Sequence, residues 1–266
     1  MTEEKKEEKK PEFIVDCTLP GVALLKLANS VKGGATPMTD ILSFKVSKTG
    51  IFSRFSDTTN IKIAEVKIPA TAFLSLDVVG EQVLGVDSKD FVKLLSKFAG
   101  LPAVRFSMKK NEYFLTISDG TDGRKRISLG LCQGKIIEKD ITLPDAFHFK
   151  VSLQDLNEAL SLAEMTEEPK VVLTIPDENH LTLEARCHTK NTSSTIDIKP
   201  TTKFTDSVRV AFQIEFLTEM TKKFSWAEEV TIACNTDFPL IMEATDEANC
   251  FLKLVVAPYI GGDGEY

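Results

Sequence analysis

The sequence lacks the features that mark membrane proteins and secreted proteins. No apolar run approaches the ~18–20 residues that a membrane-spanning helix requires, and the lysine- and glutamate-rich residues 1–12 contain no apolar secretory signal. The five cysteines are widely spread, with no Cys-x-x-Cys pair that would indicate a disulfide framework or a zinc site. We therefore expect an intracellular protein with reduced thiols and no membrane contact.

Catalytic motifs are missing as well. The chain has three histidines, and none of them belongs to a recognisable nucleophile motif. His188 follows Cys187, but neighbouring residues on a strand point to opposite faces, which argues against a shared metal. The sequence contains no Walker A loop, no G-x-G-x-x-G and no H-E-x-x-H. We predict no catalytic residue, no metal and no cofactor, and therefore a protein that is not an enzyme.

The charge is distributed unevenly along the chain. Residues 1–144 hold 22 basic and 18 acidic residues, a net charge of +4, whereas residues 145–266 hold 10 and 21, a net charge of −11. Together they give the formal net charge of −7. Such asymmetry fits a solvated acidic surface, and it equally fits attraction between unlike ends of neighbouring copies.

A larger pattern recurs four times: a short strand, an amphipathic helix and then three strands. The helices are predicted to begin near Gly21, Ser88, Leu153 and Ile214, each with a single apolar stripe at helical spacing. One face of each helix is therefore expected to pack on a sheet while the other stays free. The pattern predicts an α+β protein in which helices lie on one face of antiparallel sheets.

Two such units can share a core, so four units predict two similar domains, each made of two β-α-β-β-β units. Duplicated halves of this kind suit a symmetric assembly. The charged N-terminal tail is expected to be disordered, because it has almost no apolar residues to bury. The predicted divisions are a tail at 1–12, a first domain at 13–130, a connector at 131–146, a second domain at 147–260 and a tail at 261–266.

Several segments look familiar when they are read in order along the chain. They are Thr49–Ile51 with Asp57–Ile61, Phe91–Lys97, Phe216–Lys222, Asp237–Leu240 and Leu254–Ile260. In this order and spacing they resemble the PCNA-type DNA sliding clamps (the proliferating cell nuclear antigen family), in an archaeal-like form. No segment is as specific alone as a zinc motif, but the likeness runs from about Phe13 to Ile260 and agrees with the fourfold repeat.

The resemblance implies a DNA-clamp fold that forms a ring of three subunits joined head to tail. Such a ring encircles duplex DNA, contacts phosphates without reading the sequence, and serves as a processivity factor. It also implies partners that dock through short peptide motifs, namely DNA polymerase, the clamp loader, flap endonuclease and ligase. The neighbouring subunits would be copies of this chain or paralogues, in the cytoplasm or nucleoid of an archaeon or the nucleus of a eukaryote.

The free faces of the inner helices would then offer lysines to the DNA backbone. Lys89, Lys93 and Lys97 stand at i, i+4 and i+8, which places them on one stripe of a helix. The third helix departs from the family pattern: where clamps usually present basic residues, it offers Asn157, Glu158 and Ser161, flanked by Asp155 and Glu164. Either this helix lies away from the DNA path, or paralogous subunits supply the charge. The predicted DNA-binding residues are Lys26, Lys32, Lys89, Lys93, Lys97, Lys222 and Lys223.

Two more sets of residues follow from the resemblance. A pocket under the connector would hold the hydrophobic plug of a partner peptide, and strands at the domain edges would pair between subunits. The predicted peptide pocket consists of Ser56, Asn60, Ile61, Ile141, Leu143, Phe238, Pro239, Leu240, Val255, Ala257, Pro258 and Ile260. The predicted subunit interface consists of Tyr113, Phe114, Leu115, Thr116, Ile117, Thr192, Ser194, Ile196 and Ile198.

Two alternatives stay open beside the processivity clamp. One is a scaffold of the DNA-damage checkpoint kind, with the same fold and a signalling role. The other is a β-rich interaction protein that never closes a ring. The oligomeric state separates the second alternative from the two clamps, and stimulation of a polymerase separates the processivity clamp from the checkpoint scaffold.

Overall fold

The computed structural model describes residues 12–33, 37–143, 146–177, 180–187, 189–199 and 208–260. The two predicted tails lie almost wholly outside these residues, as do Pro144, Asp145 and His188. Four α-helices are described: α1 (Gly21–Val31), α2 (Ser88–Leu95), α3 (Leu153–Glu164) and α4 (Ile214–Lys223). A single 3-10 turn, η1 (Ala70–Ala72), is also described.

Seventeen strands are described beside the helices. In the first half they are β1 (Phe13–Leu19), β2 (Ile41–Ser47), β3 (Gly50–Ser56), β4 (Lys62–Pro69), β5 (Ser75–Val78), β6 (Gln82–Asp87), β7 (Val104–Lys109), β8 (Phe114–Asp119) and β9 (Arg126–Cys132). In the second half they are β10 (Phe147–Ser152), β11 (Lys170–Asp177), β12 (His180–Cys187), β13 (Thr192–Ile198), β14 (Val208–Gln213), β15 (Glu229–Cys234), β16 (Leu240–Thr245) and β17 (Phe251–Val256).

The four helices begin where the sequence predicts them. Local signals explain this agreement for two of them: the Asp87 carboxylate accepts a hydrogen bond from the backbone N–H of Asp90 at 2.9 Å, and the Ser152 hydroxyl accepts one from Asp155 at 3.3 Å. Each bond satisfies a backbone donor that the first turn leaves without a partner. The predicted starts of all four helices are confirmed.

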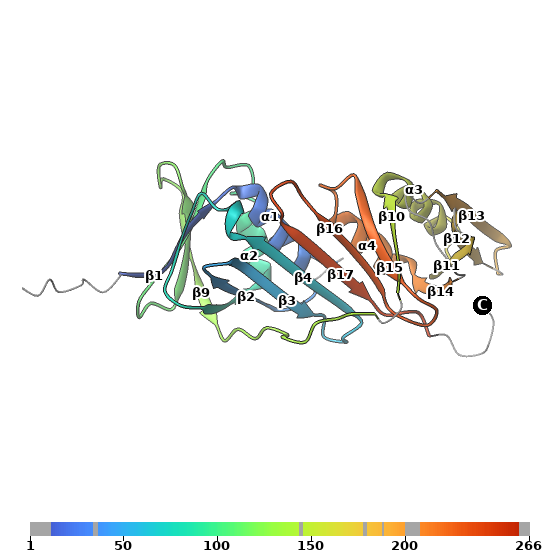
Figure 1. Cartoon of the computed structure of the whole chain (residues 1–266), viewed down its shortest axis with the longest axis horizontal. Helices are drawn as coiled ribbons and strands as arrows, with labels where there is room; N and C mark the ends of the chain where they lie inside the picture. The colour runs from blue at the N-terminus through green and yellow to red at the C-terminus, as the bar shows by residue number, and fades with distance from the viewer. Residues whose placement is uncertain are drawn as a thin grey trace, which may run out of the picture.

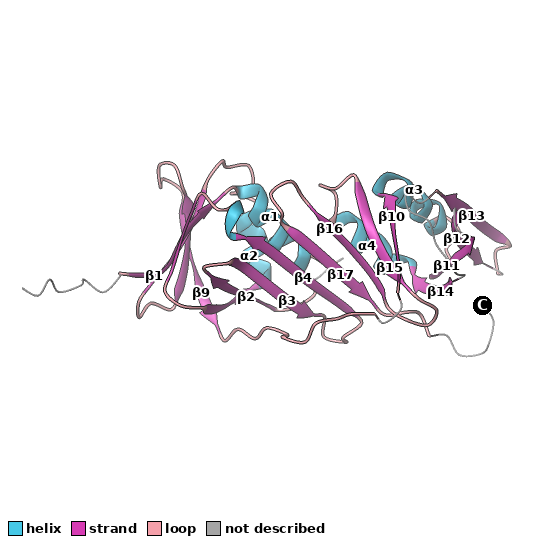
Figure 2. Ribbon diagram, in the orientation of Figure 1, coloured by secondary structure: helices cyan, strands magenta, loops and turns pink. Residues whose placement is uncertain are grey.

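The strands form antiparallel sheets that run the length of the molecule. In a thirteen-stranded sheet the order is β10-β15-β16-β17-β4-β3-β2-β6-β9-β8-β7-β1-β5, and a second sheet has the order β13-β12-β11-β14. Figure 1 shows the elongated shape that results, with β1 and β9 toward one end and β11–β13 at the other. In Figure 2, α1, α2 and α4 lie behind strands β2, β3, β4, β17 and β16.

The two halves repeat one arrangement, as the sequence predicts. In each half a strand leads directly into a helix and three strands follow it, and this happens twice. The predicted α+β class with helices on one face of antiparallel sheets is confirmed. Strand β5 was not predicted, because it has only four residues and mostly unburied side chains, so its apolar alternation is weak.

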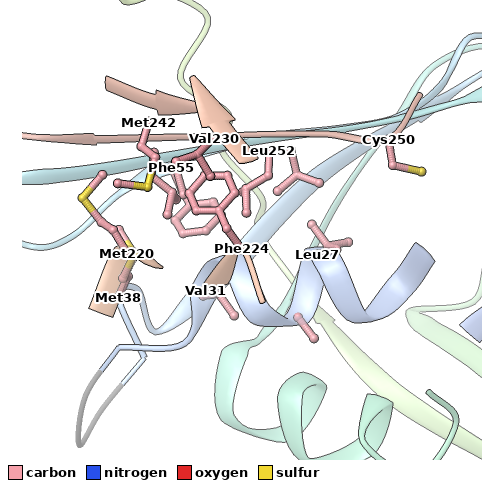
Figure 3. Close-up of a cluster of buried hydrophobic side chains, with 14 of the residues drawn as sticks. Leu27, Val31, Met38, Phe55, Met220, Phe224, Val230, Met242, Cys250 and Leu252 are labelled. Atoms are coloured by element: carbon pink, nitrogen blue, oxygen red, sulfur yellow. The ribbon is translucent and has the colours of Figure 1, made fainter. Parts of the chain in front are cut away.

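The two halves share a hydrophobic core where they meet. Strand β17 of the second half pairs with β4 of the first, from Phe251 opposite Lys67 to Val256 opposite Lys62. Beneath this pairing, Leu27 of α1 and Phe224, which directly follows α4, are both fully buried. Figure 3 shows this cluster, with Leu252 of β17 above the two helices. The junction between the halves is therefore built of paired strands and packed helices.

Candidate functional site

The lysines of α2 lie on an exposed surface. Lys89, Lys93 and Lys97 are all exposed, although α2 ends at Leu95 and Lys97 lies in the turn that follows. Lys32 after α1 and Lys222 in α4 are exposed as well, and Lys32 donates a hydrogen bond to Asn29 Oδ1 at 2.7 Å. These five of the seven predicted DNA-binding lysines keep an accessible charge.

The other two predicted lysines do not lie on a free face. Lys26 forms an ion pair with Asp246, its Nζ lies 4.3 Å from the centroid of the Trp226 ring, and its burial lowers the pKa of the ammonium. Lys223 donates to the carbonyl of Ser30 at 3.0 Å, and burial lowers its pKa to about 7. The expectation that these two lysines are exposed is wrong, because the other half of the chain covers both.

Helix α3 presents an acidic surface. Asp155, Glu158 and Glu164 are exposed, and the helix contains no lysine or arginine. Two apolar side chains, Leu162 and Met165, are exposed beside them. The sequence indicated that this helix lacks the basic residues of the family pattern. In the structure it presents an exposed acidic face bordered by apolar side chains.

The connector is fastened to the sheet by two basic side chains, one from each half. Arg54 of β3 is buried, forms an ion pair with the buried Glu65, and donates to the carbonyl of Glu138 at 2.9 Å and to Asp140 Oδ1 at 3.0 Å. Lys253 of β17 donates to the carbonyl of Ile141 at 2.7 Å. These bonds fix the path of the connector across the junction of the halves.

Beyond these bonds the connector covers an apolar surface on the outer face of the sheet. Ile141 and Leu143 pack against Ala233, Ile241 and Val255. Ile63 of β4 and Ala146 border the same cluster. Of the predicted pocket, the structure thus brings together Ile141, Leu143 and Val255.

Other predicted pocket residues lie on neighbouring segments of the chain, with side chains that are exposed or partly buried. The backbone N–H of Ala257 donates to the carbonyl of Ile61 at 2.9 Å, which places the C-terminal segment beside Ile61. Since Leu240 pairs with Val256, the chain before β16 lies next to the chain after β17. Ile61, Phe238 and Ile260 are exposed, Ser56, Pro239 and Pro258 are partly buried, and Asn60 is exposed with a left-handed φ of 57°.

Leu240 does not belong to this surface. Its side chain is buried in the main core between the sheets and helices, whereas its neighbour Ile241 points to the connector. The prediction for Leu240 is wrong, since alternate residues of a strand face opposite sides. Ile63, Ala233 and Ile241 were missed. Ile241 lies opposite Val255 in the pairing of β16 with β17, and alternation along a single strand does not reveal this register.

The two predicted edge strands differ in their positions. Strand β13 lies at the edge of its sheet, as predicted. Strand β8 does not, because β7 pairs with one of its sides and β9 with the other, and Leu115, Thr116 and Ile117 are buried. Tyr113 and Phe114, at its start, are exposed. The terminal strand at this end of the sheet is β5. Strand β9 has one side paired with β8, and its other side pairs with β6 only through Leu131 and Cys132, which leaves the rest of that side without a strand partner among the described residues.

Neither a metal site nor a membrane helix was found in the described residues. No group of three or more histidine, cysteine, aspartate or glutamate side chains is placed there to hold a metal ion. No described helix is long and apolar enough to cross a membrane.

The sequence is similar to archaeal sliding clamps along most of its length. It is 26% identical over 231 residues to the DNA polymerase sliding clamp of Pyrococcus abyssi, and 23% identical over 235 residues to that of Thermococcus sibiricus. Each of these matches covers 85% of this chain and 92% of the relative. No family model matches the sequence.

Solved structures agree with the sequence relatives. PCNA from Thermococcus kodakaraensis superimposes with a TM-score of 0.81 at 17% identity, covering 92% of this chain and 100% of that one. A. fulgidus PCNA bound to the C-terminal region of FEN-1 superimposes with a TM-score of 0.77 at 17% identity, covering 94% and 100%. The fold of this chain is therefore that of PCNA.

Proposed function

We propose that this chain is a subunit of a PCNA-type DNA sliding clamp, a ring that encircles duplex DNA and holds replication and repair enzymes on it. The observation that carries the proposal is the junction between the two halves, together with the incompletely paired strands β9 and β13. The junction joins β17 to β4, and each of these strands has a counterpart in the other half with a side that is not fully paired among the described residues.

The counterparts follow from the repeat. β17 is the last strand of the second half, as β9 is of the first, and β4 is the third strand after α1, as β13 is after α3. Pairing β9 of one copy with β13 of the next would repeat the internal junction between copies. An edge strand without a partner invites such association. A repeated head-to-tail contact closes a ring when the rotation from copy to copy adds up to a full turn, and the likeness to PCNA implies that three copies complete it.

The helices would line the central hole of the ring, through which the DNA duplex passes. Because the closed ring encloses the DNA, the protein stays on the duplex with only a few weak phosphate contacts that have no sequence preference. Lys32, Lys89 and Lys222 are exposed on or beside three of the four helices, and we assign this role to them.

The surface around the connector is the proposed docking site for partner enzymes. It combines an apolar cluster with exposed Ile61, Phe238 and Ile260, as a groove for a hydrophobic peptide anchor would. DNA polymerase, the clamp loader, flap endonuclease and ligase are the proposed partners, and a PCNA structure with bound FEN-1 supports the third of them. The chain would act as a scaffold without catalytic activity, with domains at 13–130 and 147–260 joined by the connector at 131–146.

One observation favours the checkpoint-type alternative, namely the acidic face of α3. Acidic groups facing phosphate would weaken a grip on DNA, and a signalling clamp could tolerate this weaker grip.

The first test is the mass in solution, measured by light scattering after size exclusion. We expect about three times the chain mass of 29.4 kDa, and then a longer primer extension by a cognate polymerase on singly primed circular DNA. A chain that stays monomeric at micromolar concentration, both alone and after mixing with paralogous subunits, would contradict the ring. A trimer that leaves primer extension unchanged would favour the checkpoint scaffold.

A further inference from the structure

We propose that the buried amine of Lys223 is a site of reversible carbamate formation with carbon dioxide, and that Lys32 and Lys222 bind the carbamate once it has formed. The residues belong to a single chain, so the proposal does not depend on the ring of the proposed function. It rests on a cavity between the ends of α1 and α4, on the groups that contact the Lys223 side chain, and on the charges around them.

The cavity lies where the C-terminal ends of α1 and α4 come together. Its volume is about 450 Å³, and the residues that line it are Asn29, Lys32, Gly33, Glu219, Lys222, Lys223 and Ser225. The side chain of Lys223 is buried, whereas Lys32 and Lys222 are exposed. Since one water molecule occupies about 30 Å³ in the liquid, the cavity has room for a carboxyl group on the Lys223 amine.

The amine of Lys223 contacts few groups that would stabilise a positive charge. Its Nζ donates to the carbonyl of Ser30 at 3.0 Å and to Met38 Sδ at 2.9 Å, and a thioether is a weak acceptor. Figure 3 shows Met38 beside Met220 among buried apolar side chains. The neutral amine is therefore favoured, and burial lowers the pKa of Lys223 to about 7.

Only a neutral amine can react with carbon dioxide. The nitrogen lone pair forms a bond to carbon, the electrons of one C=O π bond move to oxygen, and the nitrogen releases one proton to water. The products are R–NH–CO₂⁻ and H⁺, so no oxidant or further reactant is needed. At pH 7.5 an ordinary lysine with a pKa of about 10.4 is neutral in only about one molecule in a thousand. Lys223 is mostly neutral at that pH, and its carbamate keeps one N–H for Ser30.

The charges around the cavity favour an anion there. Lys32 and Lys222 contribute two positive charges, and the charge of Glu219 is compensated by its ion pair with Lys62 at 2.8 Å. The C-terminal ends of α1 and α4 oppose an anion with about half a negative charge each. The two lysines outweigh the two helix ends, so a carbamate on Lys223 gains cationic hydrogen-bond donors.

Lys26 is buried to the same extent but lacks these conditions. It and Lys223 are each 5% exposed. However, Lys26 forms an ion pair with Asp246, which favours its ammonium form. The cavity that Lys26 lines contains one further lysine, Lys150, and the acidic residues Glu228, Glu229, Glu243, Asp246 and Glu247. A carbamate on Lys26 would face these carboxylates, so we expect none there.

Isotope labelling tests the proposal on the full chain. The protein is incubated with isotopically labelled bicarbonate, carbamates are trapped as ethyl esters with triethyloxonium, and mass spectrometry of proteolytic peptides locates the label. At pH 7.5 we expect at least about a hundredfold more label at Lys223 than at exposed Lys110, and none at Lys26. A peptide with a free α-amino group, whose pKa is about 8, is the positive control for trapping.

The pH profile tests the state of the amine. Formation of a carbamate from bicarbonate and a neutral amine consumes no net proton, so at fixed bicarbonate the label follows the neutral fraction of the amine. The label at Lys223 should reach half of its maximum near pH 7. Lys110 should gain label only above about pH 9. A profile of Lys223 that matches that of Lys110 would contradict the proposal.

A double variant tests the two cationic partners. Lys32→Gln with Lys222→Gln should lower the label at Lys223 by about tenfold or more, because hydrogen bonds from charged donors are then lost. The comparison is made at about pH 8.5, where Lys223 is neutral in both proteins. The matched control, Lys110→Gln with Lys139→Gln, removes two exposed lysines away from the cavity and should keep the label.

The outcomes are distinct from those that test the clamp. No label at Lys223, with the control peptide labelled, overturns the carbamate site. Equal label in the double variant and the unchanged chain overturns the role of Lys32 and Lys222. Neither result affects the proposed function, which trimer mass and primer extension test separately.

Discussion

At the scale of single residues, Lys223 is held where its charge is disfavoured. Its Nζ lies 3.0 Å from the carbonyl of Ser30 and 2.9 Å from Met38 Sδ, with the side chain buried. Burial lowers its pKa from 10.5 to about 7; Glu219 opposes this shift and Lys62 adds to it. Near neutral pH the folded chain therefore holds this lysine partly in its neutral form.

A pH dependence of stability follows. Between about pH 7 and 10 the unfolded chain binds a proton at Lys223 that the folded chain does not bind, so the free energy of unfolding should rise with pH in this window. Below pH 7 both states are protonated and this contribution is constant. Urea unfolding at pH 7, 8 and 9 measures the rise.

Lys223→Met is the matched variant, because it keeps the apolar stem without the titrating group. It should show a smaller rise in unfolding free energy between pH 7 and 9 than the unchanged chain. Equal slopes in both proteins would show that Lys223 keeps an ordinary pKa.

The lysines also show what the sequence could not supply at this scale. A helical stripe shows which side of one helix is polar, but not whether another element covers that side. Lys26 and Lys223 are polar residues on amphipathic helices, yet the junction between the halves buries them. Likewise, the alternation that places Leu240 in the core was visible in the sequence, whereas the role of Ile241 depends on where the connector lies.

At the scale of elements, one buried ion pair holds the middle of the connector. Arg54 satisfies Glu65 and two connector groups at once, the carbonyl of Glu138 and the carboxylate of Asp140. Lys67 also pairs with Glu65, at 2.6 Å, from the exposed side. Removal of the guanidinium would leave a buried carboxylate with one partner and would remove the bonds that hold the connector at Glu138 and Asp140, while Lys253 still binds it at Ile141.

Arg54→Met should therefore lower the free energy of unfolding by about 3 kcal/mol, the usual cost of removing one partner of a buried pair. It should also speed tryptic cleavage after Lys135 and Lys139, which lie in the connector, and weaken binding of a fluorescent partner peptide. Urea unfolding, timed proteolysis and anisotropy measure the three effects.

The double variant Arg54→Met and Glu65→Met separates stability from positioning. It should recover much of the stability that the single variant lacks, since an apolar pair can replace a buried ion pair. Its connector should stay as easily cleaved as in the single variant, because no group then binds the carbonyl of Glu138. Slow cleavage in the double variant would refute the role of Arg54 in holding the connector.

The elements divide clearly into those that the sequence predicts and those that it does not. Helix starts depend on caps such as Asp87 and Ser152 and on an apolar stripe, which are local signals. Whether a strand lies at an edge depends on the order of the whole sheet. The strand predicted at Tyr113–Ile117 is present as β8, but the prediction that it lies at an edge is wrong, since β9 turns back along it.

At the scale of the whole molecule, the charged helices determine how the ring would hold DNA. Lys32, Lys89 and Lys222 are exposed, and a ring repeats them in every copy. Contacts with phosphate release counterions, so the affinity for duplex DNA should fall with rising salt.

Replacing these three lysines with alanine should weaken binding equally for all sequences. The slope of log K against log salt should become shallower by about 0.9 for each phosphate that is no longer neutralised by a lysine. Equilibrium binding to linear duplexes at several salt concentrations measures this slope. Lys48, Lys110 and Lys139 are exposed lysines away from the helices, and their triple alanine variant should keep the original slope.

The proposed ring contains two kinds of joint: one between the two halves of each chain, and one between neighbouring copies. They differ in the interactions that must break before the ring can open. The joint inside each chain has paired strands, a shared core and the connector, which is covalent and fastened by Arg54 and Lys253. A joint between copies would have strand edges and helix surfaces alone. A closed circle of DNA has no end to thread, so it must enter sideways, and the gate is then a joint between copies. Each ring would have as many equivalent gates as it has chains.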